Sequence, residues 1–289
     1  MIIELLARFD EAANIRWAQR MEEAGIRVVY GVKGLKVHAK LTHIERRGSN
    51  LACVSTGNFH EGNARVYTDG ILMTADKRLV REVAKVFEFI EQPYKNFSFK
   101  HLLVSPQHMR QALYELIKGE IKAAKSGKPA EILVKINHVS DPELIQRLYA
   151  AAHAGVSVKM LVRGNCSLVT RNHPDAANLS VHGIVDRYLE HARFLIFHNR
   201  GNPRYFLASA DWMPRNLDQR IEVAAPVYDP EIQQQIRHIV ECGLRDNVKR
   251  RVIDGSGENC PVSRSANEKA FRSQEQLYAQ ARNAATSQP

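Results

Sequence analysis

Two histidines of this chain, His38 and His191, are each followed by polar residues at the same intervals. His38 lies in the run GLKVHAKL and His191 in the run LEHARFLIF. Three polar residues follow each histidine in the same order. The first is an amide in one half and a carboxylate in the other, the second is an asparagine, and the third is a carboxylate. A lone histidine in a strand is usually structural, but a histidine repeated together with its polar neighbours indicates a shared function. The matched pairs, each with the same sequence separation as the two histidines, are Asn58 and Asp211, Asn63 and Asn216, and Asp69 and Glu222.

A pair of histidines suits the transfer of a phosphoryl group or the cleavage of a phosphodiester. One neutral imidazole attacks phosphorus, while the other protonates the leaving oxygen. We expect Asp69 and Glu222 to orient the two imidazoles, although a charge at a strand end also fits an exposed surface. Asn63 and Asn216 are expected to donate hydrogen bonds to phosphate oxygens.

Cations accompany both histidines. Lys40 and Arg193 each lie two positions after a histidine, so they share its face of the strand and bring positive charge to a phosphate. Arg163 follows a strand-like run in LVRGNCS, where α/β folds bind ligands, with a solvated loop cation as the alternative. Tyr67 and Arg8 are weak candidates by themselves, since Tyr67 also fits a packed strand aromatic and Arg8 only ends an apolar run.

The elements that must position these residues alternate between helical and strand-like patterns, which indicates an α/β fold. Apolar residues at helical spacing, together with capping residues and closing glycines, predict helices over 10–24, 76–90, 105–127, 141–154 and 229–244. Short β-branched runs between the helices predict strands. These runs are IRVVYG, NLACVST, EILVKIN, VSVKMLVRG, ARFLIFH, RYFLASA and IEVAAPVY.

The repeat predicts two duplicated halves, each with a mixed sheet flanked by helices. We expect a first domain over 1–103, a second over 104–256 and a polar tail over 257–289 that is partly helical or disordered and forms an appendage outside the core. The first half matches the second only from the run MIIELLARF onward, which suggests an N-terminally truncated first domain. Equivalent strand ends of a duplicated protein tend to meet near a pseudo-two-fold axis, which would bring the two histidines together.

The charge of the chain favours an anionic partner. The 289 residues carry a net charge of +10 and a pI near 9.5, and a basic protein of this size tends to meet polyanions. The four cysteines have no CxxC spacing, so we expect reduced thiols without a zinc site. No apolar run approaches the roughly 18 residues of a membrane span.

On the basis of these residues and their spacing, the chain resembles the C-terminal half of the bacterial polyphosphate kinase family. The resemblance runs from about residue 6 to residue 256 and implies two phospholipase D-like domains. The motifs that carry it are ARFDEAANI, GLKVHAKL, STGNFHEGNARVYTD, VSPQ, LVRGNCSL, IVDRYLEHARFLIF and SADWMPRNLDQRIEV.

The resemblance implies that the enzyme transfers the terminal phosphate of ATP reversibly to inorganic polyphosphate through a phosphohistidine. His38 matches the phosphorylated nucleophile, and His191 matches an acid/base that also touches the nucleotide phosphates. Tyr67 and Arg163 match positions that contact the nucleotide. Arg8 matches an arginine at the magnesium and phosphate region, and because an arginine is no metal ligand at neutral pH, we interpret it as a phosphate clamp beside Mg²⁺.

The partners implied by the resemblance are ATP and ADP, polyphosphate, Mg²⁺ and further copies of the full-length protein. The resemblance also implies a cytoplasmic or loosely membrane-attached enzyme, with no specific nucleic acid. No aspartate follows HAK in the first half, and the second half has HAR, which favours the kinase over the phosphodiesterases of the wider superfamily. The alternatives are such a phosphodiesterase, which would need no ATP, and a non-catalytic fragment that binds polyanions.

Overall fold

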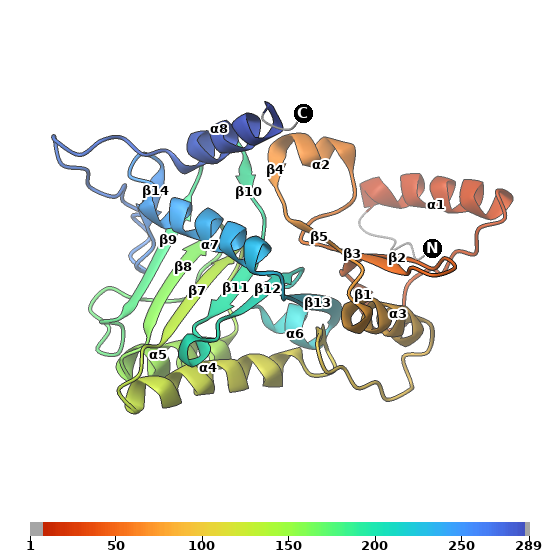
Figure 1. Ribbon diagram of the computed structural model, residues 1–289, viewed down its shortest axis with the longest axis horizontal. Helices are drawn as coiled ribbons and strands as arrows, with labels where there is room; N and C mark the ends of the chain where they lie inside the picture. The colour runs from red at the N-terminus through yellow and green to blue at the C-terminus, as the bar shows by residue number, and fades with distance from the viewer. Residues whose placement is uncertain (1–7, 287–289) are drawn as a thin grey trace.

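The second half of the chain is built on one large mixed sheet. The computed structural model describes residues 8–286, and it describes side chains from residue 15 onward except at 285. The sheet has the order β1-β13-β12-β11-β7-β8-β9-β14, with β6 also paired to β13 (Figure 1). The strands are β1 (Lys36–Val37), β6 (Leu103–Ser105), β7 (Glu131–Ile136), β8 (Ser157–Val162), β9 (Leu179–Ile184), β11 (Phe194–Phe197), β12 (Arg204–Ala208), β13 (Arg220–Val227) and β14 (Arg250–Val252).

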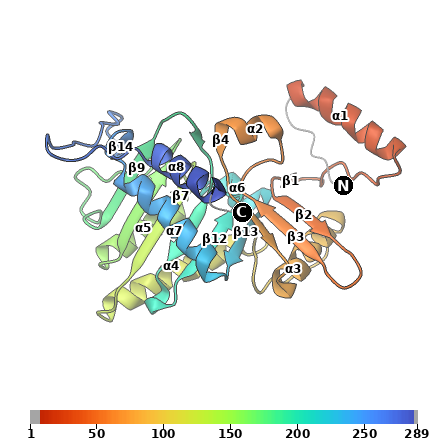
Figure 2. The ribbon, with the colours of Figure 1, turned by 45° about the horizontal axis from the view of Figure 1, so that its top comes forward.

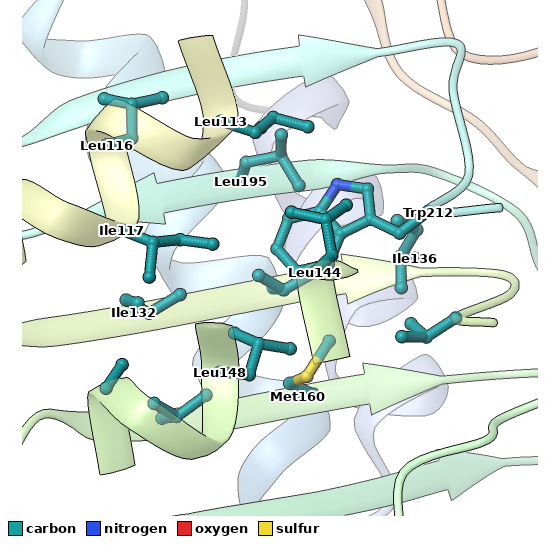
Figure 3. Packing of buried hydrophobic residues seen from close by; sticks show 14 of the residues in the cluster. Leu113, Leu116, Ile117, Ile132, Ile136, Leu144, Leu148, Met160, Leu195 and Trp212 are labelled. Carbon is teal, nitrogen blue, oxygen red and sulfur yellow. The ribbon is translucent and has the colours of Figure 1, made fainter. Parts of the chain in front are cut away.

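Helices cover both faces of this sheet. α4 (Met109–Lys125) and α5 (Pro142–His153) lie on one face, whereas α7 (Pro230–Arg245) and α8 (Ser273–Thr286) lie on the other (Figure 1). Because both faces are covered, the central strands are mainly apolar on both sides, and all residues of β7 after Glu131 are buried, including Lys135. Trp212 fills the core beneath α4 and α5 together with leucines and isoleucines of those helices and of the sheet (Figure 3).

The first half repeats the later part of this framework on a smaller scale. Its three-stranded sheet has the order β2-β3-β5 and packs on α3 (Figure 2). The sequence separation of His38 and His191, termed the repeat offset, also relates β3 to β12, and it relates the starts of α2 and α3 to the starts of α6 (Pro214–Asp218) and α7. The first-half elements are α1 (Arg8–Glu23), β2 (Lys40–Ile44), β3 (Leu51–Ser55), α2 (Glu61–Val66), β4 (Tyr67–Thr68), β5 (Ile71–Thr74) and α3 (Lys77–Glu91). The expected duplicated α/β architecture is therefore confirmed.

The two halves exchange short strands. β1 of the first half pairs in parallel with β13 of the second, with Val37 opposite Ile221. Adding the repeat offset to β1 gives β10 (Leu189–Glu190), and subtracting it from the start of β13 gives β4. These two strands also pair in parallel, with Glu190 opposite Thr68. The register is the same in both pairs. A pseudo-two-fold axis therefore relates the two exchanges, and each histidine follows directly after an exchanged strand.

The helix expected over 105–127 begins only at Met109, because Ser105 is the last residue of β6. Two further expectations differ from the structure. The first concerns the run IRVVYG (26–31), which forms no strand, although Val29 lies in a single bridge and a further isolated bridge joins Val32 and Leu35. Its counterpart β8 pairs with β7, whereas the first-half segment equivalent to β7, residues 1–7, lies outside the described residues. A strand needs a hydrogen-bonded neighbour, and none of the described segments provides one for this run.

The second concerns the polar tail, which was expected to be an appendage. Its helix α8 begins at Ser273 and packs along α7, as both views of the ribbon show (Figures 1 and 2). Ser273 and Gln274 are almost fully buried. No helix within residues 8–286 combines the length and the apolar character that a membrane crossing requires.

The connection between the halves is fixed by one buried carboxylate. Glu82 of α3 is 5% exposed and accepts hydrogen bonds from the backbone N–H groups of Lys100, His101 and Leu102, at 2.6, 2.9 and 2.7 Å. This segment leads directly into β6, so the carboxylate of one half fixes the entry to the other.

We expect Glu82→Ala to lower the free energy of unfolding by about 2–4 kcal/mol, because a buried N–H that loses its acceptor costs about 1–3 kcal/mol. Urea unfolding followed by circular dichroism measures the change. Glu88→Ala is the matched control, since Glu88 lies on the same helix but is exposed. Equal stability of the two variants would contradict the assigned role of Glu82.

Candidate active site

His38 is held at the boundary of the halves by its backbone and by its ring. Its N–H donates to the carbonyl of Ile221 at 3.0 Å, which extends the pairing of β1 with β13. Its Nδ1 lies 2.8 Å from Oε1 and 2.9 Å from Oε2 of Glu222. The histidine belongs to the first half and the carboxylate to the second.

Glu222 is fully buried and needs several donors to remain ionised. The hydroxyl of Ser209 donates to Oε2, and the amide of Asn216 donates to Oε1 at 2.6 Å. Burial acts to raise the pKa of Glu222, but His38, Lys40 and Ser209 outweigh burial and hold this pKa below its usual value. The carboxylate is therefore ionised at neutral pH and accepts a proton-bearing Nδ1.

The same arrangement recurs around His191 with the halves exchanged. The N–H of His191 donates to the carbonyl of Thr68 at 3.3 Å, and its Nδ1 lies 2.7 Å from Oδ1 of Asp69. The hydroxyl of Thr56 donates to the same carboxylate at 2.6 Å. Burial acts to raise the pKa of Asp69, but His191 and Thr56 hold it below its usual value. Here the histidine belongs to the second half and the carboxylate to the first.

Two hydroxyls in this site were missed by sequence reasoning, although a signal for them existed. The repeat offset relates Thr56 to Ser209, so each hydroxyl follows the histidine of its own half at the same interval. Gly57 next to Thr56 is also required, because a Cβ there would lie 2.0 Å from Oδ2 of Asp69. The small residues of STGN therefore make room for the carboxylate.

The contact with Glu222 fixes the tautomer of His38. An ionised carboxylate can only accept hydrogen bonds, so Nδ1 carries the proton and Nε2 keeps its lone pair. Burial lowers the pKa of His38, and Lys40 and Arg193 lower it further, while Glu222 acts in the opposite direction. The net shift is downward, so the imidazole is neutral at pH 7 and its Nε2 is available for attack on phosphorus.

The two cations that follow the histidines are buried beneath them. Lys40 donates to the carbonyl of His38, and Nη1 of Arg193 donates to the carbonyl of His191 at 3.2 Å. Arg193 also binds both oxygens of Asp211, at 3.1 and 3.2 Å. The structure therefore places these cations as supports of the histidine backbone, from which their charge still acts on the site.

Tyr67 and Arg163 lie on the side of the site that carries His191. The ring centroids of Tyr67 and His191 are 5.0 Å apart. Arg163 is half-buried, and its Nε donates to Oδ1 of Asn137 at 3.3 Å. The amide of Asn137 in turn reaches the carbonyl of His191 at 3.5 Å. The structure thus brings both predicted nucleotide-contacting residues to one histidine.

The two predicted asparagines have different environments. Asn216 is buried against Glu222, whereas Asn63 is half-buried in α2, which stands away from the large sheet (Figure 1). Asn216 therefore orients a carboxylate, which differs from the predicted contact with phosphate. Arg8 is the first residue of α1, but its side chain lies outside the described part of the chain.

The predicted Mg²⁺ has no cage of protein ligands within the described side chains, where no group of three or more histidines, cysteines or carboxylates could hold a metal ion. The carboxylates of the site are already engaged: Glu222 and Asp69 by imidazoles and Asp211 by a guanidinium. Mg²⁺ commonly takes only one or two carboxylates and completes its shell with substrate phosphates and water. This fits a metal that enters with a nucleotide.

Comparison with known proteins agrees with this geometry. The family model for polyphosphate kinase C-terminal domain 1 matches residues 1–96, and that for C-terminal domain 2 matches residues 102–274. The crystal structure of the polyphosphate kinase from Porphyromonas gingivalis superimposes with a TM-score of 0.89 at 41% identity, over 98% of this chain and 44% of that one.

Two curated relatives show the extent of the match. The polyphosphate kinase of Vibrio parahaemolyticus is 48% identical over 96% of this chain and 40% of its own length. That of Escherichia coli K12 is 47% identical over 96% of this chain and 41% of its own length. The chain thus spans about two fifths of the curated relatives that it matches. It belongs to the polyphosphate kinase family, of which it carries the two C-terminal domains.

Proposed function

We propose that this chain carries the phosphoryl-transfer site of a polyphosphate kinase, which moves the terminal phosphate of ATP reversibly to polyphosphate through phosphorylated His38. The observation that supports this most directly is the contact of Nδ1 of His38 with the buried Glu222, which leaves Nε2 as the reactive atom. The family supports the choice of ATP and polyphosphate. The net charge of +10 suits two polyanionic substrates.

In the first step, the lone pair of Nε2 forms a bond to the terminal phosphorus of ATP, and the bond from phosphorus to the bridging oxygen breaks. ADP leaves with that electron pair. The phosphorylated ring gains positive charge, which Glu222 stabilises through the proton on Nδ1. In the second step, a terminal oxygen of polyphosphate displaces the imidazole, which returns to its neutral form.

His191 and its neighbours act on the leaving and entering oxygens. Asp69 fixes the ring through Nδ1, so Nε2 of His191 is directed away from the carboxylate and can exchange a proton with an oxygen of the substrate. Tyr67 and Arg163 beside this ring serve the nucleotide in the proposal. Arg8 serves as a phosphate clamp.

Mg²⁺ is the proposed cofactor and would neutralise charge on the phosphates of the bound nucleotide. Its ligands would come mainly from the phosphates and water, since the carboxylates of the site hold imidazoles and guanidinium groups. The full-length protein is proposed to act as a homo-oligomer in the cytoplasm or loosely attached to a membrane.

Incubation with ATP labelled at the terminal phosphate should transfer the label to the protein, in a form that is labile to acid and stable to base. His38→Ala should abolish this label, since the acceptor atom is removed. His43→Ala is the matched control, because His43 lies on the adjacent strand β2 outside the site. Label that persists in His38→Ala would refute the assignment, and a wild-type chain that binds polyphosphate without labelling would indicate a non-catalytic polyanion-binding module.

The midpoint at which the rate of His38 labelling falls with decreasing pH should lie below 6.5, because the pKa of His38 is lowered from its ordinary value of 6.5. Protonation of Nε2 removes the attacking lone pair, so the loss of rate occurs on the acid side. Single-turnover labelling across a series of buffers measures this midpoint. A midpoint above 6.5 would contradict the neutral nucleophile.

Glu222→Gln should slow the labelling of His38 by about 100-fold or more, because a neutral amide replaces the ionised carboxylate and can turn its NH2 group toward Nδ1, which no longer fixes the tautomer. Glu222 raises the pKa of His38, so the acid limb of the variant should also move to lower pH. Glu231→Gln, at an exposed position of the same half, should change neither the rate nor the midpoint. A normal rate in Glu222→Gln would show that the contact between the halves is dispensable.

A further inference from the structure

The strand before His191 is anchored by a buried polar cluster around Glu190, a position that Val37 occupies before His38. Glu190, the residue before His191, forms an ion pair with Lys135 of β7 at 2.8 Å, and both side chains are nearly buried. The residue before His38 is Val37, which packs against the apolar core. The equivalent positions before the two histidines thus carry an apolar residue in the first half and a paired, charged residue in the second.

The C-terminal tail completes this cluster. The side-chain amide of Gln274, in the first turn of α8, donates to Oε1 of Glu190 at 2.6 Å and to the carbonyl of Tyr188 at 2.8 Å. Its carbonyl oxygen accepts from the N–H of Tyr188 at 2.8 Å. Figure 1 shows β10 between α8 and β4. One buried amide therefore fixes both polar backbone groups of Tyr188 and the carboxylate beside His191.

The tail is itself held in place next to this contact. Asp246, at the end of α7, is fully buried and accepts from the backbone N–H of Ser273 at 2.7 Å and from its hydroxyl at 2.8 Å. Arg272 pairs with Asp186 on the loop that leads to β10. Gln274 is thus anchored on a fixed helix start and acts on the strand as a rigid support.

A buried ion pair contributes little net stability, because both charges lose their hydration on burial. Stability alone therefore does not explain why this strand is fixed by charge. Replacement of such a pair by apolar residues is often neutral or stabilising, and Val37 shows that this fold accepts the apolar solution at the equivalent position. Directional bonds restrict the position of a neighbouring group more tightly than apolar contacts do. The residue adjacent to Glu190 is His191, whose position these bonds therefore restrict. The carbonyl of His191 is also fixed by Arg193 and Asn137.

We propose that Gln274 is a positioning residue for the phosphoryl-transfer site, which acts through Glu190 to hold the ring of His191 in line with the substrate. The C-terminal tail is then a part of the catalytic apparatus. The inference rests on the proposed function for the role of His191 in transfer, but the geometric part of it can be measured without turnover.

The test compares Gln274→Ala with Gln280→Ala in the 289-residue chain. Gln280 lies on the same helix and bonds to His238 at 2.8 Å, away from Glu190, so it controls for general loosening of α8. Histidine side chains labelled with ¹³C and ¹⁵N report each imidazole, and His38→Ala and His191→Ala assign the two signals. Gln274→Ala should shift or broaden the signal of His191 and leave that of His38 unchanged, while Gln280→Ala should leave both unchanged.

A second variant covers the case that Gln274→Ala unfolds the tail. Lys135→Met with Glu190→Val rebuilds the apolar solution of the first half and leaves no buried charge unpaired. It should fold, yet show the same change at His191. An unchanged His191 signal in both variants, or an equal change of His38 and His191, would overturn the proposal in favour of a purely structural tail.

A measurement of phosphate transfer distinguishes a failure of this inference from a failure of the proposed function. If wild-type protein labels His38, Gln274→Ala should lower the rate of transfer from labelled ATP by about tenfold to a hundredfold with little change in the apparent affinity for ATP. Equal transfer rates in Gln274→Ala and Gln280→Ala would overturn the proposal. If wild-type protein does not label, the proposed function fails, and the His191 signal alone decides whether Gln274 positions the ring.

Discussion

Each imidazole of the site is held by a carboxylate that the other half of the chain supplies. His38 meets Glu222, and His191 meets Asp69. These crossed contacts depend on the exchanged strand pairs β1·β13 and β10·β4. The first pair places His38 beside β13, which carries Glu222, and the second places His191 beside the turn after β4, which carries Asp69. Neither carboxylate orients the histidine of its own half, so the site can form only when both halves fold and dock.

Burial makes the two contacts unequal. Glu222 has no exposed surface and receives an imidazole, a hydroxyl and an amide, whereas the side chain of Asp69 is 18% exposed and receives an imidazole and a hydroxyl. A fully buried carboxylate would be costly without these donors. The drier environment also lowers the pKa of His38, which favours the neutral form of this ring. A symmetric scaffold thus gives the two histidines different environments.

The sequence allowed prediction of the residues of the site better than of their contacts. The equal intervals after His38 and His191 predicted which carboxylates belong to the site, because a duplicated fold preserves spacing. They could not predict that the contacts cross, since this depends on the pairing of β1 and β10, which are too short for any periodic pattern. Lys40 and Arg193 were predicted to lie near the histidines, but their bonds to backbone carbonyls depend on local geometry that spacing does not encode.

The parts of the fold that were misjudged share one physical cause. IRVVYG has the residues of a strand, but a strand forms only beside a neighbour, and that information lies elsewhere in the chain. The sequence of the tail is polar and only weakly helical in pattern. Its residue Gln274 nevertheless donates a hydrogen bond to Glu190, which lies far away in the sequence. Short-range patterns detect long helices such as α5 and α7, which begin at capped Asp-Pro pairs, and they do not detect single polar contacts between distant segments.

The tautomer of His38 tests the central claim most directly. Long-range ¹H–¹⁵N correlation spectra of histidine-labelled protein near neutral pH distinguish a proton on Nδ1 from a proton on Nε2. The contact with Glu222 predicts a neutral ring with its proton on Nδ1 and a free Nε2. A neutral His38 with its proton on Nε2 would contradict both the crossed carboxylate contact and the assignment of Nε2 as the atom that receives the phosphate.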